Sequence, residues 1–207
     1  MDRKLLIIIS ILILGFVGFV VFQKSSTPAA EVTRSNNVYG KLDSKVELTE
    51  FVDFQCEACA AYYPTLEAVK DAYKDKVRFQ VKYFPLGGGH QYSRLTASYA
   101  EAAARQGKFF EMQAKLFPNQ KIWETGSTQQ YLDQYAQEIG LDMEKLRADL
   151  KDSSLSDTIN ADLGEVRKLG ATGTPTFVLN GKKIENPDNT MEAFSKILDQ
   201  ALTGAGN

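Results

Sequence analysis

The chain has 207 residues, with 24 Lys and Arg, 26 Asp and Glu, two cysteines and one histidine. A hydrophobic fraction of 43% suffices for a packed core, and a net charge of −2 without a basic stripe excludes typical nucleic-acid binding. One histidine and two cysteines are too few for a multi-histidine metal site or a zinc module, so neither a metal nor a cofactor is expected.

The N-terminus carries an apolar run from Leu5 to Phe22, in which Ser10 is the only polar residue. As a helix this run is roughly 27 Å long, close to the hydrocarbon thickness of a bilayer, about 30 Å. It predicts one transmembrane helix over residues 5–22, with residues 1–4, which include the basic Arg3 and Lys4, in the cytoplasm and the rest of the chain outside. A cleaved secretory signal is the alternative, because residues 27–30 are small. The basic flank and the position disfavour a buried core helix.

Residues 23–37 are rich in Ser, Thr, Pro, Ala and Asn, and are predicted to form a flexible linker. A strand buried on both faces is expected over Val46–Phe54. It runs directly into the motif Cys56-Glu57-Ala58-Cys59, and helical spacing follows over Ala60–Lys74. The two cysteines are therefore expected where a strand meets a helix.

Clean alternation over Val77–Tyr83 predicts a second strand. After Gly87-Gly88-Gly89 the pattern becomes helical. This glycine run lacks the spacing and the Lys-Ser/Thr of a phosphate-binding loop, so it is interpreted as a hinge. Five segments carry helical periodicity or strong helix formers: Leu95–Arg105, Phe109–Phe117, Gln129–Ile139, Met143–Leu150 and Ser156–Leu169.

The C-terminal part predicts a hairpin and a helix. Thr176–Leu179 and Lys182–Ile184 flank Asn180-Gly181, a dipeptide that favours a tight turn. A final helix is expected over Thr190–Leu202. The predicted order is strand, cysteine motif, helix, strand, helical block, hairpin and helix.

Two cysteines at a helix N-terminus suit redox chemistry. The partial positive charge and free amides of the helix N-terminus stabilise a thiolate on Cys56. Cys59 lies about one turn later, so a Cys56–Cys59 disulfide forms and breaks with little backbone movement. A static structural disulfide is an alternative, but a loop this short stabilises a fold weakly. A metal site would need two further ligands.

These motifs together resemble the DsbA-like thiol:disulfide oxidoreductases of the thioredoxin superfamily. The motifs that carry the resemblance are Phe51–Cys59, Phe84-Pro85-Leu86 followed by His90, Gln106–Phe110 and Gly173-Thr174-Pro175-Thr176-Phe177. The resemblance implies an α/β, thioredoxin-like fold with an inserted helical subdomain, here preceded by the transmembrane helix. The two thioredoxin-like parts are then residues 38–86 and 166–207, and the insertion is residues 87–165.

The resemblance also implies roles for individual residues. Cys56 matches the exposed nucleophile and Cys59 the buried resolving cysteine. Pro175 matches a cis proline that faces the cysteines, with Thr174 binding the substrate strand; a plain strand-edge proline is the alternative. Glu50 matches a buried acid that assists proton transfer at the resolving thiol, and burial with a raised pKa is plausible between Leu48 and Val52. An exposed Glu50 without a function is the alternative.

The implied activity is the introduction of disulfides into exported proteins that carry cysteine thiols, on the extracytoplasmic side of the cell membrane, with a membrane redox partner that reoxidises the cysteines. A reductase or isomerase on the same fold is one alternative, and a non-catalytic, membrane-tethered binding or chaperone module is another. Glu57-Ala58 replaces the Pro-His pair of the best-known family pattern, so a higher Cys56 pKa and a less oxidising centre are expected. His90 is interpreted as a capping or packing residue rather than a general base.

Overall fold

The computed structural model describes residues 12–13, 15–16 and 34–205. Except for residues 12–13 and 15–16, the predicted transmembrane helix over residues 5–22 lies outside the described residues, as does the predicted linker up to residue 33. Among the residues that are described, we find no helix with both the length and the hydropathy that crossing a membrane requires.

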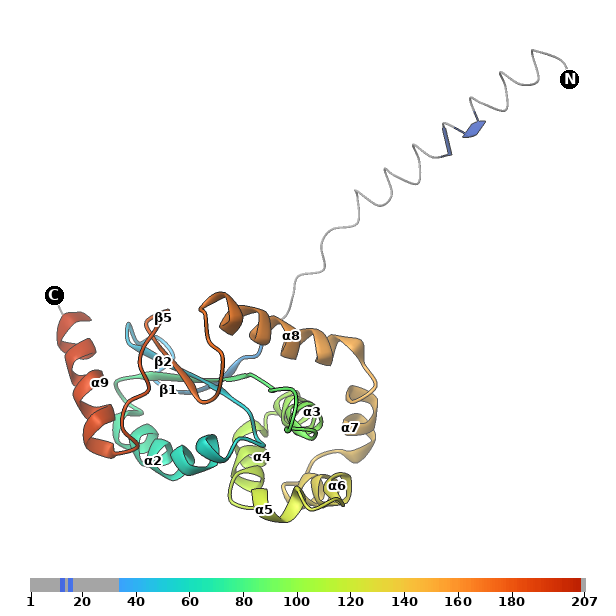
Figure 1. Cartoon of the computed structure of the whole chain (residues 1–207), viewed down its shortest axis with the longest axis horizontal. Helices are drawn as coiled ribbons and strands as arrows, with labels where there is room; N and C mark the ends of the chain where they lie inside the picture. The colour runs from blue at the N-terminus through green and yellow to red at the C-terminus, as the bar shows by residue number, and fades with distance from the viewer. Residues whose placement is uncertain (1–11, 14, 17–33, 206–207) are drawn as a thin grey trace, which may run out of the picture. The chain divides into compact units, whose positions relative to one another are not determined.

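A mixed five-stranded sheet lies at the centre of residues 34–205 (Figure 1). Its strands are β1 (Asn37–Gly40), β2 (Glu47–Val52), β3 (Arg78–Tyr83), β4 (Thr176–Leu179) and β5 (Lys182–Lys183). Their order across the sheet is β1-β3-β2-β4-β5. The central pair, β2 and β3, is parallel, and the other neighbouring strands pair antiparallel.

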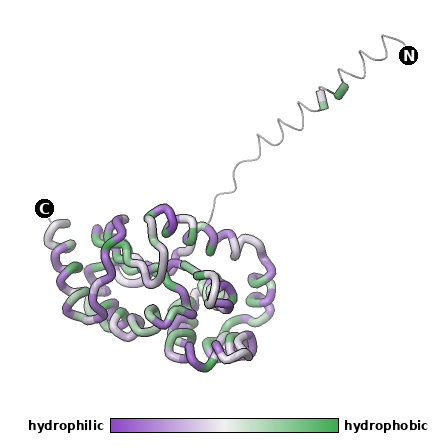
Figure 2. The backbone as a smooth tube through the Cα atoms, viewed as in Figure 1, coloured by the Kyte–Doolittle hydropathy of each residue, from purple (hydrophilic) through white to green (hydrophobic). Residues whose placement is uncertain are grey.

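The described helices pack on the sheet and beside it (Figure 1). They are α2 (Glu57–Tyr73), α3 (Ser93–Ala104), α4 (Phe109–Leu116), α5 (Gln120–Trp123), α6 (Thr128–Glu138), α7 (Met143–Asp149), α8 (Ser153–Lys168) and α9 (Met191–Ala205). Helices α3 to α8 follow one another between β3 and β4, as the predicted helical insertion requires. Hydrophilic and hydrophobic residues alternate along these helices, as expected of helices with one buried face (Figure 2).

Strand β2 is covered on both faces, as its apolar sequence predicts. Side chains of successive strand residues point to opposite faces. Leu48 packs with Leu66 of α2 and Phe194 of α9. Phe51 packs on the other side with Val166 of α8. The cysteine motif therefore begins at the end of a strand whose position is fixed by packing on two sides.

Every helix and strand expected after residue 45 is present, with its ends displaced by at most a few residues. Two short elements, β1 and α5, are not among the sequence-based predictions. Ser35 and Asn37 are buried, so the folded part begins earlier than the predicted linker end at residue 37. Their polar side chains form hydrogen bonds inside the fold, to Asp162 and to Val81 O respectively, which a composition-based prediction of a linker overlooks.

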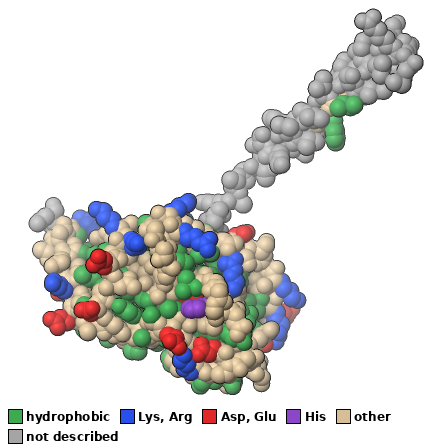
Figure 3. All heavy atoms as spheres, viewed as in Figure 1, with side chains coloured by type: hydrophobic (Ala, Val, Ile, Leu, Met, Phe, Trp, Pro, Cys, Tyr) green, Lys and Arg blue, Asp and Glu red, His purple; other side chains and the backbone are tan. Residues whose placement is uncertain are grey.

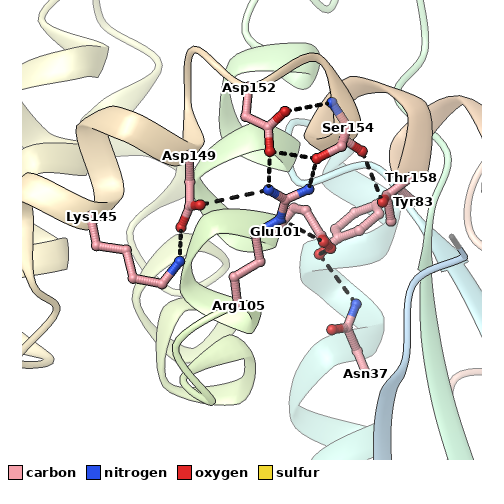
Figure 4. Close-up of polar contacts among 9 residues, drawn as sticks. All are labelled: Asn37, Tyr83, Glu101, Arg105, Lys145, Asp149, Asp152, Ser154 and Thr158. Atoms are coloured by element: carbon pink, nitrogen blue, oxygen red, sulfur yellow. Dashed lines mark hydrogen bonds and ion pairs between the residues drawn. The ribbon is translucent and has the colours of Figure 1, made fainter.

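A polar network fastens the helical insertion to the sheet (Figure 4). Asn37 of β1 donates to the Tyr83 hydroxyl at 3.2 Å, and this hydroxyl donates to Glu101 of α3 at 3.0 Å. Arg105 lies within 3.5 Å of the same Glu101 and donates to Asp152, which caps α8, at 2.9 Å. The network links β1, β3, α3 and α8 without leaving these buried polar groups unpaired.

Candidate active site

The two cysteines lie at the start of α2. Cys56 is the N-cap residue, with an extended backbone, and its amide donates to Asp53 O at 3.0 Å. Cys59 lies in the first turn. Cys56 is 8% exposed and Cys59 is 0% exposed, and both are free thiols. Among the described residues, no side chain caps α2, so its first amides remain available to the sulfur of Cys56.

The surroundings of Cys56 favour its thiolate. A hydrogen bond with the Cys59 thiol is the largest factor that lowers the pKa of Cys56, from the usual 9.0 to about 5. Partial burial opposes this shift, and the backbone amides of Ala58 and Cys59 support it. Hydrogen bonds to the charged form of a group lower its pKa in this way.

The loop before β4 brings Thr174 and Pro175 to this sulfur. The Thr174–Pro175 peptide bond is cis. The Cys56 thiol lies 3.3 Å from Thr174 O, although 118 positions separate the two residues. The Thr174 hydroxyl is buried without a hydrogen-bond partner among the described residues, so it remains available to a thiolate at Cys56 and lowers the pKa of that thiol. Three of the predicted site residues are thus in one place.

Cys59 behaves in the opposite way. Burial raises its pKa well above the usual 9.0, and its hydrogen bond with Cys56 acts in the same direction. A buried thiol keeps its proton because a dry environment disfavours the charged form. In the dithiol form, negative charge therefore collects on Cys56.

Glu50 is buried in the central strand β2, which excludes the exposed alternative. Burial raises its pKa from 4.5 to about 8, and the nearby charge of Lys70 on α2 limits this rise. The charge of Glu50 in turn raises the pKa of Cys59. A carboxyl group that titrates near neutral pH thus interacts electrostatically with the buried thiol.

The carboxylate of Glu57 is paired with Lys121 of α5, and the hydrogen bond from Lys121 is the main factor that lowers the pKa of Glu57. The expectation of a higher Cys56 pKa assumes that the charge of Glu57 acts on Cys56 without a counter-charge. The structure supplies that counter-charge from 64 positions away, a distance over which the sequence carries no pairing signal.

His90 lies in the loop before α3, and its Nδ1 is 3.0 Å from Oδ2 of Asp53. This contact agrees with the interpretation of His90 as a packing residue. Asp53, for which the sequence motifs predict no role, is completely buried three positions before Cys56. The only signal for it in the sequence is an acid between the apolar residues Val52 and Phe54.

An open groove of about 460 Å³ adjoins Thr174 and Pro175. It is lined by residues 171–176 and 183–186. Asn186 forms one of its edges and donates to Pro175 O at 2.9 Å. Thr174, one of the lining residues, is the residue whose carbonyl oxygen lies 3.3 Å from the Cys56 thiol.

Solved structures with this fold include oxidoreductases. A thioredoxin-like oxidoreductase from Silicibacter pomeroyi is 25% identical, with a TM-score of 0.68 over 80% of this chain and 91% of that chain. Oxidised BdbD from Bacillus subtilis is 24% identical, with a TM-score of 0.71 over 81% and 92%. The thiol-disulfide exchange protein alpha-DsbA2 from Wolbachia pipientis is 21% identical, with a TM-score of 0.65 over 80% and 86%. For BdbD and alpha-DsbA2, which are less than 25% identical to this chain, the likeness shows the fold alone.

Among curated proteins, the Na(+)/H(+) antiporter NhaA 3 of Salinispora tropica is 31% identical over 170 residues, which are 82% of this chain and 25% of the antiporter. The chain thus spans about a quarter of the length of such a relative. The profile of the family described as thioredoxin matches residues 33–200, which contain the strands, the helical insertion and the cysteine motif. The chain therefore belongs to the thioredoxin family.

Proposed function

We propose that this protein is an extracytoplasmic thiol:disulfide oxidoreductase that introduces disulfides into exported proteins through Cys56 and Cys59. One observation carries the proposal: the pKa values of the two thiols are shifted in opposite directions, that of Cys56 down to about 5 and that of Cys59 to well above 9. The name of alpha-DsbA2, a thiol-disulfide exchange protein with the same fold, supports it.

The first step consumes the Cys56–Cys59 disulfide. A substrate thiolate attacks the sulfur of Cys56, a substrate–Cys56 disulfide forms, and the Cys56–Cys59 bond breaks. Cys59 leaves with the electron pair. Because burial disfavours a thiolate at Cys59, its sulfur takes up a proton, and Glu50 is the proposed donor.

The second step releases the product. A second thiolate of the same substrate attacks the substrate sulfur of the mixed disulfide and expels Cys56 as a thiolate. The substrate dithiol is oxidised to a disulfide, and the cysteine pair is reduced by the same two electrons. The low pKa of Cys56 favours this direction, because a stabilised thiolate makes Cys56 a good leaving group and stabilises the reduced protein.

Thr174 and Pro175 are the proposed substrate-binding residues. The contact between Cys56 and Thr174 O supports this assignment, because it places this loop against the sulfur that a substrate cysteine attacks. The adjoining groove leaves room for residues that flank the substrate cysteine. A substrate segment in extended conformation is proposed to lie along the loop.

The apolar run Leu5–Phe22 supports a single transmembrane anchor that holds the catalytic part outside the cytoplasmic membrane. A membrane redox partner is proposed to reoxidise the cysteine pair after each cycle. Alkaline extraction of membranes from cells that express the full chain tests the anchor. The protein is expected in the membrane pellet, and its release into the supernatant would contradict an anchor.

Oxidative refolding of a reduced model protein with several disulfides tests the proposed function. The oxidised full chain is expected to accelerate disulfide formation. Cys56→Ser is expected to abolish this activity. Cys59→Ser also lacks the internal disulfide and is expected to be inactive, but its Cys56 thiolate can attack a disulfide already present in the substrate, which breaks that bond and leaves a mixed disulfide that accumulates. Ser153→Ala, at the distant start of α8, serves as a control with full activity. Unchanged activity in Cys56→Ser would leave only a binding or chaperone module.

A further inference from the structure

The three residues before Cys56 are each hydrogen-bonded to the helical insertion or to the segment that leads into it. The bonds run from Leu86 N to Asp53 Oδ2 (2.8 Å), from Gln120 Nε2 to Phe54 O (2.9 Å) and from Tyr92 N to Gln55 Oε1 (2.7 Å). The loop that presents the nucleophile is therefore held by residues that lie outside the cysteine motif.

Asp53 is the centre of this arrangement. Its Oδ2 accepts from Leu86 N at 2.8 Å and from the Ser93 hydroxyl at 2.7 Å, and it lies 3.0 Å from His90 Nδ1. Its Oδ1 accepts from Gln55 N at 2.8 Å. The carboxyl group of Asp53 is fully buried, and burial of a charged group is costly unless hydrogen bonds compensate for it. Its four partners provide such hydrogen bonds, and hydrogen bonds to a carboxylate are among the strong ones in proteins.

The backbone of Asp53 touches both redox cysteines. Its carbonyl accepts from Cys56 N at 3.0 Å. At Cys59, burial is the main influence and raises the pKa, while a hydrogen bond from the backbone of Asp53 lowers it. A displacement of Asp53 would therefore move the N-cap of α2 relative to Thr174 O.

We propose that Asp53 is a positioning residue for thiol exchange: its carboxylate fixes the loop that carries Cys56 against the helical insertion and so holds the Cys56 sulfur against the first amides of α2 and near the Thr174 side chain. This inference rests on the proposed function and adds a residue to the same site. His90, whose side chain is 31% exposed, is a donor that reaches the surface (Figure 3). Glu57 of α2, paired with Lys121 of α5, is a charged group that interacts with His90, and Glu50 of β2 is a buried acid whose charge interacts with Cys56.

Asp53→Asn tests the proposal in the reduced full chain. The amide has the size of the carboxylate, but its nitrogen cannot accept a hydrogen bond, so either Gln55 N or the donors at Oδ2 lose their acceptor. The readout is the rate at which Cys56 reacts with iodoacetamide as a function of pH. The midpoint is expected to rise by about one pH unit, a tenfold change in the ionisation constant. Loss of a negative charge alone would lower the midpoint, because nearby anions disfavour a thiolate.

Two milder variants keep the test valid if Asp53→Asn does not fold. His90→Ala and Ser93→Ala each remove one donor and leave the carboxylate with three partners. Each is expected to raise the midpoint by less than Asp53→Asn does. Asp142→Asn is the matched control, because this carboxylate accepts two amide hydrogen bonds at the start of α7. Its midpoint is expected to equal that of the unmodified chain.

An unchanged or lower midpoint in folded Asp53→Asn would overturn the proposal, even if the variant unfolds at a lower temperature. The same holds if Asp142→Asn shifts the midpoint as much. Where only the two milder variants fold, unchanged midpoints in both overturn it. The alkylation rate requires no protein substrate, so this result is independent of the refolding assay. Failure of the proposed function would instead appear as absent exchange in the unmodified chain.

Discussion

Two identical side chains three positions apart acquire different chemistry from their surroundings. Cys56 has hydrogen-bond donors on several sides, from Cys59, the first amides of α2 and the Thr174 hydroxyl. Cys59 is enclosed in the apolar core together with Phe54 and Val81. Because a hydrogen bond stabilises a thiolate and a dry environment destabilises it, one sulfur becomes the nucleophile and the other a leaving group that needs a proton.

Glu50 gives the oxidised protein a pH-dependent stability. With both thiols free, the folded protein holds this carboxyl group neutral up to a pKa of about 8, whereas the unfolded chain ionises it near 4.5; burial is the main cause, so a raised pKa is also expected in the oxidised protein. The unfolded state therefore binds fewer protons between these values, and stability falls as pH rises through this window, on the order of 1.4 kcal/mol per pH unit. In Glu50→Gln this fall is expected to disappear. Urea unfolding of both oxidised proteins between about pH 5 and 8 checks this, and parallel curves would contradict it.

Lys121, an exposed residue, is expected to influence the pKa of Cys56. Lys121→Gln leaves the Glu57 carboxylate beside Cys56 without its partner, so the pKa of Cys56 should rise. Glu57→Gln should lower it. Both shifts should be a few tenths of a pH unit, since both side chains are exposed and exposed pairs interact weakly. Glutathione equilibration measures the result, with Lys121→Gln less oxidising; equal potentials for both variants would refute the pairing argument.

At the scale of elements, local signals predict structure best. Asn180 and Gly181 have positive φ values of 50° and 77°, as a tight hairpin turn requires, and the dipeptide alone predicts them. The helices of the insertion are likewise evident from their periodicity. Strand β1 is hidden because its four residues pair with β3, more than 35 positions away, and its neighbours look like a linker. Helix α5 has only four residues, too few for a period.

Alanine substitutions at Gly40 and Gly181 test why glycine is required at two turns. Both have positive φ, but a Cβ at Gly40 would lie 2.5 Å from Val77 O, whereas a Cβ at Gly181 meets no atom of the described part of the chain within 4 Å. Gly181→Ala should cost only the conformational strain, roughly 1 kcal/mol. Gly40→Ala adds a backbone clash, so about 2–4 kcal/mol is expected. Urea unfolding of both variants checks the difference, and equal losses would contradict it.

For the whole molecule, the site depends on contacts that no local pattern contains. The sequence predicts the two cysteines and, by resemblance, Glu50, Thr174 and Pro175. It does not indicate which residues hold them, because Asp53 acts through partners between positions 86 and 93. These hydrogen bonds depend on how the helical insertion packs against the sheet. They therefore cannot be predicted from local patterns in a single sequence.

Substitution of Ser35 tests whether the start of the folded part stabilises the packing of the insertion against the sheet. Its hydroxyl donates to Oδ2 of Asp162, a buried acid of α8 whose Oδ1 has no partner among the described residues. Ser35→Ala leaves Asp162 with the Tyr83 amide, and a loss of roughly 1–3 kcal/mol is expected. Ser98→Ala, which removes a bond within α3, is the matched control. Equal unfolding free energies of the two variants would show that Asp162 needs no such partner.

The central claim is that the fold makes Cys56, and not Cys59, the nucleophilic thiolate. The rate of alkylation of each cysteine in the reduced protein, located by peptide mapping as pH is raised, measures this most directly. The account predicts that Cys56 reacts with a midpoint near pH 5 and that Cys59 stays unreactive beyond pH 9. A midpoint for Cys56 near 9, or equal reactivity of the two thiols, would contradict it.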